Sequence, residues 1–156
     1  MIYNYKKYIF KKFLINLAKV TFIFSTVILI MNLFEEISFF KNNEEFILLP
    51  IYLTLLNIPS VLFEIFPFIF LISTLFFFIE VIDKEEINIF KLYGITNLKI
   101  IQILSLLTFF IGLLILIFFY NISSNLKFFY YDLKNQFTKD DKYLAVVTGN
   151  GLWIRD

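Results

Sequence analysis

Charged residues divide the chain into blocks that are separated by long apolar segments. Residues 13–34 carry a single charge, Lys19, and residues 100–126 carry none. Residues 46–79 form a further apolar segment, in which Glu64 is the only charge. A helix of about 20 residues spans the roughly 30 Å hydrocarbon core of a bilayer. Each of these segments is therefore long enough to cross a membrane.

The middle segment is too long for a single crossing, because residues 46–79 in one helix would reach about 50 Å. Pro59 predicts a break inside it, since a proline disfavours helical backbone at the residue before it. Ser60 is suited to cap a new helix. We therefore expect a short interfacial helix over residues 46–57 and a second span over residues 60–79. Together with the other two segments, this predicts three transmembrane helices.

The lysines indicate how these helices are oriented. The N-terminal arm carries four lysines and residues 80–99 carry three, whereas the loop over residues 35–45 carries only Lys41. Cytoplasmic loops of membrane proteins are enriched in Lys and Arg close to the spans. The N-terminus and the 80–99 loop are thus predicted to be cytoplasmic.

The 80–99 loop contains apolar residues at helical spacing, which predict a short amphipathic helix over residues 85–93. The apolar stripe comprises Ile87, Phe90, Leu92 and Tyr93. Gly94 is placed to end this helix, and Thr96 or Asn97 is placed to cap the third span. Such a helix either rests on the lipid surface or docks into a groove on a cytoplasmic partner.

The last 30 residues have a different pattern. Residues 127–142 alternate aromatic and charged side chains, as an amphipathic extension leaving the membrane does. Residues 143–147 and 152–155 predict two strands around an Asn-Gly turn. A lone hairpin is marginal in water, so we expect it to begin a β domain or to be completed by a partner. This divides the chain into a transmembrane domain, residues 1–126, and an extension with the start of a β domain, residues 127–156.

Composition excludes several classes of protein. Of the 156 residues, 60% are apolar and only 17% are charged, too few to cover a water-soluble globule. A net charge of +1 gives no support for nucleic-acid binding. The absence of Cys and His excludes thiol chemistry and Cys/His metal sites. No phosphate-binding Gly-rich motif is present, so we expect neither catalytic residues, metal nor cofactor.

Three polar residues near the predicted outer side are candidates for the rim of a substrate cavity. Glu64 is an ionisable residue inside an apolar span, which suggests a function. Its place near the outer start of that predicted span favours an interfacial glutamate over a buried functional one, because the cost of a charge falls toward the headgroups. Asn32 and Glu35 lie near the outer end of the first span.

The ordered set of these features resembles the lipopolysaccharide-export permeases LptF and LptG. The resemblance rests on a lysine-rich start, on Leu33-Phe34-Glu35-Glu36 at the end of the first span, and on the break from Asn57-Ile58-Pro59 to Phe66-Pro67. Residues 85–96, Glu-Glu-Ile-Asn-Ile-Phe-Lys-Leu-Tyr-Gly-Ile-Thr, are similar to the coupling helix of that family. Gly151-Leu152-Trp153-Ile154-Arg155-Asp156 resembles the opening of its periplasmic β-jellyroll, in a form that favours LptG.

The resemblance implies a permease subunit in the bacterial inner membrane with its N-terminus in the cytoplasm. It implies three partners: a dimeric cytoplasmic ABC ATPase, a paired homologous permease subunit and a periplasmic bridge protein. The cargo would be lipopolysaccharide, moved toward the outer membrane. The expected ATPase contact on the coupling helix comprises Glu85, Glu86, Phe90, Tyr93 and Gly94, with Glu86 meeting a basic residue of the ATPase.

Two features depart from the family pattern. Family members often carry a basic residue near the outer end of the first span, where this sequence has Asn32 followed by Glu35 and Glu36. Tyr93 also stands where a small residue is usual. The alternatives are a membrane scaffold without transport activity, whose cytoplasmic loop rests on lipid, and the permease of a different lipid or lipoprotein exporter.

Overall fold

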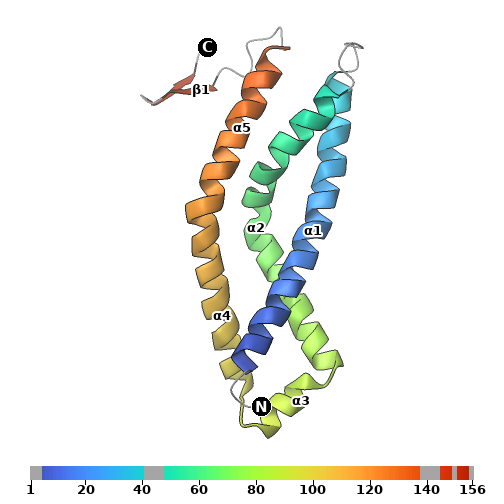
Figure 1. The fold of residues 1–156 in the computed structure, drawn as a ribbon, viewed down its shortest axis with the longest axis vertical. Coiled ribbons are helices and arrows are strands. Elements are labelled where there is room, and N and C mark those ends of the chain that lie inside the picture. The colour runs from blue at the N-terminus through green and yellow to red at the C-terminus, as the bar shows by residue number, and fades with distance from the viewer. Residues whose placement is uncertain (1–4, 41–47, 138–144, 149–150, 155–156) are drawn as a thin grey trace.

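The computed structural model describes residues 5–40, 48–137, 145–148 and 151–154. Three long helical segments run side by side, and a short helix joins the second to the third at one end (Figure 1). The elements are α1 (Tyr5–Phe39), α2 (Leu49–Asp83), α3 (Glu86–Leu92), α4 (Asn97–Leu114), the π-helix η2 (Ile115–Phe119), α5 (Tyr120–Asn135), β1 (Ala145–Thr148) and β2 (Gly151–Ile154). Helices α4, η2 and α5 follow one another without interruption and form the third long segment.

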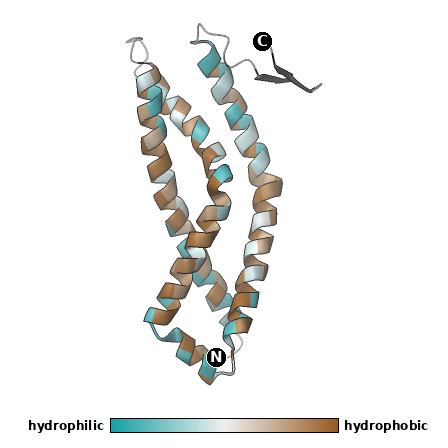
Figure 2. Ribbon diagram, turned by 180° about the vertical axis from the view of Figure 1, so that it is seen from behind, coloured by the Kyte–Doolittle hydropathy of each residue, from teal (hydrophilic) through white to brown (hydrophobic). Residues whose placement is uncertain are grey.

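The three long segments have the length and the apolar composition of membrane spans. Apolar residues occupy most of their length, and hydrophilic residues gather toward the ends of the bundle (Figure 2). Three spans were expected from the sequence, and this part of the fold is confirmed. The bounds of about 13–34, 60–79 and 100–126 for the parts inside the bilayer stay predictions, because the helices continue beyond them at both ends.

The expected break before Pro59 is wrong, because α2 runs without interruption from Leu49 to Asp83 with Pro59 and Pro67 inside it. Ser60 is buried within the helix and does not cap it. Prolines are tolerated in membrane helices where neighbouring groups contact the disturbed backbone. In this bundle α2 packs against both α1 and α5, and the Ser123 hydroxyl on α5 donates a hydrogen bond to the Pro59 carbonyl at 3.1 Å, which joins the two helices at this turn. The prolines leave α2 visibly bent instead of broken (Figure 1).

The third long segment extends further than the span expected from the sequence and changes its helical pitch near the middle. Residues 115–119 form a π-helix, a feature that is often found at functional sites. The Asn121 side-chain amide donates to the Ile117 carbonyl at 3.0 Å, so a side chain binds a backbone group of this irregular turn.

The ends of α3 follow the sequence prediction. Gly94 has a φ of +73°, and the amides of Ile95 and Gly94 donate to the carbonyls of Phe90 and Lys91, each at 2.9 Å. This pair of bonds is the Schellman arrangement that ends many helices. Thr96 caps α4, since its hydroxyl accepts a hydrogen bond from the Lys99 amide.

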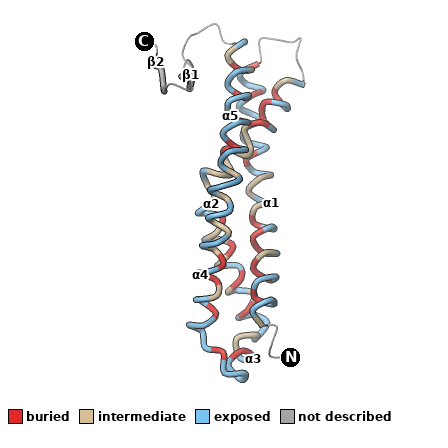
Figure 3. The backbone as a smooth tube through the Cα atoms, turned by 60° about the vertical axis from the view of Figure 1, so that its left-hand side comes forward, coloured by how far each residue is buried: buried red, intermediate tan, exposed pale blue. Residues whose placement is uncertain are grey.

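Buried apolar side chains form two clusters, one at each end of the bundle. The cluster at the α3 end combines residues of α1, α2, α3 and α4 and includes Ile9, Phe13, Phe77, Val81, Phe90 and Ile95. The cluster at the opposite end comprises Phe40, Leu53, Leu56 and Tyr130, with Leu126 and Leu133 packed against it. Figure 3 shows the buried positions along the faces where the helices meet.

Strands β1 and β2 pair antiparallel, with a register that runs from Ala145 opposite Ile154 to Thr148 opposite Gly151. Of the turn expected over residues 148–151, Thr148 and Gly151 belong to the two strands, and residues 149 and 150 lie outside the described residues. That these strands begin a β-jellyroll stays a prediction.

The turn after α3 gives a first test. We expect Gly94→Ala to lower the free energy of unfolding by about 1 kcal/mol, because a side chain disfavours the positive φ. A Cβ at this position meets no atom within 4 Å, so the cost is one of backbone conformation alone. Unfolding of the purified protein in detergent measures it. Gly112→Ala, inside α4, is the control. The added Cβ would lie 3.9 Å from a Phe70 ring atom, an ordinary van der Waals contact, so this variant should not lower stability. Equal loss in both variants would contradict the prediction.

Candidate functional site

Helix α3 is held against the end of the bundle by buried apolar residues. Phe90 and Ile95 are buried in the cluster shared with α1, α2 and α4. The Phe90 ring also packs edge-on against Tyr8 of α1, with 6.3 Å between ring centroids. Only short connections join α3 to its neighbours, since α2 ends at Asp83 and α4 begins at Asn97. Displacement of α3 therefore has to move the ends of α2 and α4.

The remaining surface of α3 is exposed and combines the polar Asn88 and Lys91 with apolar and aromatic side chains. Ile89, Leu92 and Tyr93 lie on it, and Leu92 is 86% exposed. Leu98, at the start of α4, adds a further exposed apolar side chain next to this helix. An exposed apolar surface of this kind marks a contact with lipid or with a partner.

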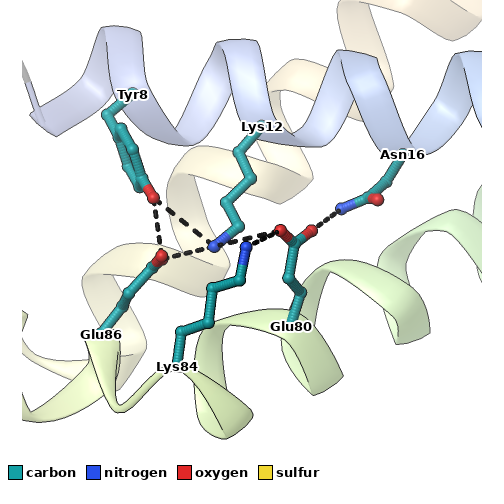
Figure 4. Close-up of polar contacts among 6 residues, drawn as sticks. All are labelled: Tyr8, Lys12, Asn16, Glu80, Lys84 and Glu86. Atoms are coloured by element: carbon teal, nitrogen blue, oxygen red, sulfur yellow. Dashed lines mark hydrogen bonds and ion pairs between the residues drawn. The ribbon is translucent and has the colours of Figure 1, made fainter.

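Glu86, the glutamate expected to meet the ATPase, is directed toward α1 instead of outward (Figure 4). Its Oε1 accepts a hydrogen bond from the Tyr8 hydroxyl at 2.7 Å. Its Oε2 lies 2.5 Å from the Nζ of Lys12. The side chains of Lys12 and Glu86 are only 8% and 16% exposed, so water screens this ion pair little.

Lys12 also reaches the end of α2. Its Nζ lies 3.8 Å from Oε1 of Glu80, and the Asn16 amide donates to Oε2 of Glu80 at 3.1 Å. Lys84 binds the same carboxylate from the solvent side at 2.7 Å (Figure 4). This hydrogen bond raises the pKa of the Lys84 ammonium above its usual value. We call Tyr8, Lys12, Asn16, Glu80, Lys84 and Glu86 the inner polar cluster.

Most of the inner polar cluster was not expected from the sequence, in which the N-terminal lysines indicated only orientation. Tyr8, Lys12 and Asn16 follow one another at intervals of four residues, which places them on one helix face. That spacing is the signal that sets Lys12 apart from its exposed neighbour Lys11. The partners on α2 and α3 are more than 60 residues away, and no local pattern identifies them.

The five residues expected to contact an ATPase thus differ in whether they face the bundle or are exposed. Glu86 and Phe90 face the bundle, whereas Tyr93 and Gly94 are exposed. Glu85 is exposed as well and is the only described residue other than glycine with a positive φ, 54°. It forms the turn between α2 and α3, a conformation that costs a non-glycine residue free energy.

A second ion pair lies at the opposite end of the bundle and joins α1 to α5. Glu36, 2% exposed, accepts hydrogen bonds from the Tyr130 hydroxyl at 2.7 Å and from Lys134 at 2.8 Å, both at Oε1. Lys134 in turn donates to the Tyr130 oxygen at 2.6 Å. We call these three residues the outer polar cluster. From the sequence, Glu36 is only one of two adjacent acidic residues at the end of the first span, and its burial was not expected.

Two of the expected rim residues lie beside the outer polar cluster along α1. Asn32 is half-buried, and its Nδ2 has no hydrogen-bond partner among the described residues. Glu35 is exposed. Neither residue lines the groove that contains the third candidate, Glu64.

Glu64 lies near the middle of α2, at the edge of a groove of about 860 Å³ between α2 and the third long segment. Aromatic and aliphatic side chains, including Phe66, Phe70 and Phe109, form most of its lining, together with Pro67 and the first turn of η2. Oε1 of Glu64 lies 2.8 Å from the Nζ of Lys127 on α5. The groove is thus apolar with one ion pair at its edge. Among the described residues, no group of acidic side chains is arranged to hold a metal ion.

Comparison with known protein families gives a match that covers nearly the whole chain. The family model for the lipopolysaccharide export system permease LptF/LptG matches residues 7–156. The chain belongs to the LptF/LptG family. Comparison with curated proteins and with solved structures gave no match.

Membership of this family places the chain among the permease subunits of lipopolysaccharide export. Such subunits are multi-pass proteins of the inner membrane, in agreement with the three long apolar segments. They act in transport as parts of a larger transporter and are generally not catalytic themselves.

The outer polar cluster gives a second test. We expect Glu36→Ala to lower the free energy of unfolding by on the order of 3 kcal/mol, because the change removes the buried counterion of Lys134 and the acceptor of Tyr130. Thermal unfolding of the purified protein in detergent measures this loss. Glu35→Ala removes the adjacent, exposed carboxylate and should change stability by less than about 0.5 kcal/mol. Similar values for the two variants would show that the cluster does not hold α1 and α5 together.

Proposed function

We propose that this chain is a permease subunit of an ABC-type exporter that moves lipopolysaccharide from the inner membrane toward the outer membrane, driven by a separate cytoplasmic ATPase. In this proposal the N-terminus and α3 lie on the cytoplasmic side. The chain pairs with a homologous permease subunit, and β1 and β2 belong to a periplasmic β-jellyroll that passes the lipid to a bridge protein.

The observation that supports an ATPase contact best is the division of α3 into two faces. Phe90 and Ile95 anchor the helix in the bundle, whereas Leu92 and Tyr93 are exposed on its other side. In helix-in-groove docking, apolar side chains on one face of a helix enter a hydrophobic groove of the partner. We therefore propose that Ile89, Leu92, Tyr93 and Leu98 form the docking surface, and that Glu85 and Gly94 set its position through the turns at either end.

The mechanism that follows is mechanical. Closure of the ATPase dimer on binding ATP pushes α3, and the short connections transmit this push to the ends of α2 and α4. Both segments contain an irregular stretch at mid-length, the prolines of α2 and the π-helix η2, where they can bend. The groove between them changes its shape as they tilt, and lipid in contact with it is displaced.

The lipid contact that we propose is the groove edged by Glu64. Its apolar lining suits acyl chains, and the Glu64–Lys127 pair presents charge at one edge. A lysine beside such a groove can bind the phosphate of a lipid headgroup. Asn32 and Glu35 are proposed to contribute to the outer rim from α1.

Charge reversal at Glu86 is a poor test of ATPase docking. It would place two ammonium groups next to each other, at positions 86 and 12, and would detach α3 from α1 whether or not an ATPase binds. A substitution on the exposed face leaves the bundle intact, and Leu92 is the most exposed apolar residue there.

The docking surface gives the third test. We expect Leu92→Gln to reduce co-purification of the ATPase with the membrane-extracted protein by about tenfold, the scale on which loss of one central apolar contact weakens an interface. Leu48→Gln, at the far end of the bundle and 76% exposed, is the matched control and should retain the ATPase.

The same experiment separates the exporter from the alternatives. If the wild-type protein retrieves no ATPase and α3 binds only to vesicles, the scaffold whose loop rests on lipid becomes the better account. If an ATPase is retrieved but purified complexes release no lipopolysaccharide to a periplasmic acceptor, the cargo assignment is wrong and a different lipid or lipoprotein has to be considered.

A further inference from the structure

The inner polar cluster connects α3 to a helix with which it shares no short connection. Helices α2 and α4 flank α3 along the chain, whereas α1 lies more than 40 residues before it. The contact between α3 and α1 comprises the Phe90–Tyr8 ring pair and the two hydrogen bonds to Glu86. Glu86 is the only residue of α3 that the described structure joins to α1 by a charged contact.

Apolar and charged contacts resist movement differently. The hydrophobic effect is non-directional, so burial of apolar surface by itself does not define one orientation of a helix against its neighbour. A carboxylate that binds a hydroxyl at one oxygen and an ammonium at the other has a defined geometry. Both Glu86 oxygens are bound in this way, and Lys12 is 8% exposed. The pair therefore fixes α3 against α1 in position and in rotation.

We propose that Lys12 is a positioning residue that makes α1 a direct receiver of the movement of α3. Resting on the function proposed above, the inference is that a push on α3 reaches α1 through the Lys12–Glu86 pair, in parallel with its passage through the connections to α2 and α4. Because Lys12 also approaches Glu80 near the end of α2, one ammonium group joins all three elements at this end.

A consequence follows for the opposite end of the bundle. Helix α1 is bound to α5 there by the outer polar cluster. Movement that enters α1 at Lys12 can thus reach α5, and with it the segment that leads to β1, without passing through the bendable middle of α2 or through η2. Loss of the Lys12 contact should therefore leave the rate of ATP hydrolysis unchanged and lower the amount of lipid transported per ATP.

The test uses the assembled transporter in proteoliposomes and compares Lys12→Met with Lys11→Met and Lys12→Arg. Lys11 is the exposed neighbour and serves as the matched control. We expect Lys12→Met to retain the ATPase and its hydrolysis rate but to lower the lipid released per ATP by about tenfold, the usual scale of coupling between two sites. Lys11→Met should resemble the wild type, and Lys12→Arg, which keeps the charge, should recover most of the release.

Three outcomes would overturn the proposal. Normal release per ATP in Lys12→Met would show that α1 receives nothing through this pair. Loss of the ATPase itself in Lys12→Met would show that Lys12 only holds α3 in a shape that docks. A release deficit in Lys12→Met/Glu86→Gln that exceeds that of Glu86→Gln alone would show that Lys12 does not act through Glu86. If the wild-type protein binds no ATPase, the proposed function fails first, and this result is distinct from all three.

A second variant distinguishes loss of the contact between α1 and α3 from a general loss of folding. The 156 residues contain no cysteine, so Lys12→Cys/Glu86→Cys introduces one pair of thiols into this part of the protein. Bridging them with a reversible bifunctional thiol reagent should restore release per ATP, and reduction should abolish it again. Release that bridging leaves unchanged, or blocks, would contradict the proposal, since α1 and α3 would then move independently.

Discussion

A charged side chain that is withdrawn from water among apolar helices needs a counterion close by, and this requirement shapes both ends of the bundle. Lys12 and Glu86 meet this need at one end, Glu36 and Lys134 at the other. A buried pair adds little stability compared with apolar residues of the same shape, but breaking it is costly. Its main effect is therefore on specificity: only an arrangement that brings both partners together is tolerated. In this protein the two pairs define how α1 lies against α3 and against α5.

The middle of the bundle is organised differently. The prolines of α2, the π-helix η2 and the apolar groove all lie between the two polar ends. The structure thus combines two ends held by directional contacts with a middle in which the helical hydrogen bonding is irregular. The mechanism proposed above requires both properties, because rigid ends transmit displacement and an irregular middle permits bending.

The division of α3 into buried and exposed residues changes the interpretation of its motif. The motif that resembles a coupling helix combines side chains with two different tasks. Phe90 and Glu86 bind the helix to its own bundle, and Leu92 and Tyr93 are available to a partner. A substitution at Glu86 therefore acts on the inside of the subunit as well as on any docking. Exposure separates these tasks, and residue type alone does not.

The sequence by itself determined the number of long helices, the short helix between the second and the third, and its end at Gly94, and it limited the cap of the third span to Thr96 or Asn97. These features depend on local properties, namely apolar segment length, helical spacing and the conformational preferences of glycine and threonine. The tertiary structure alone decided that α2 continues through Pro59, that Glu86 is directed to Lys12, and that Glu36 is buried against Lys134. Each of these depends on groups that are distant along the chain: Lys12 for Glu86, Lys134 for Glu36, and the packing of α1 and α5 for α2. The free energy of a buried charge or a disturbed helix depends on which groups come to lie next to it.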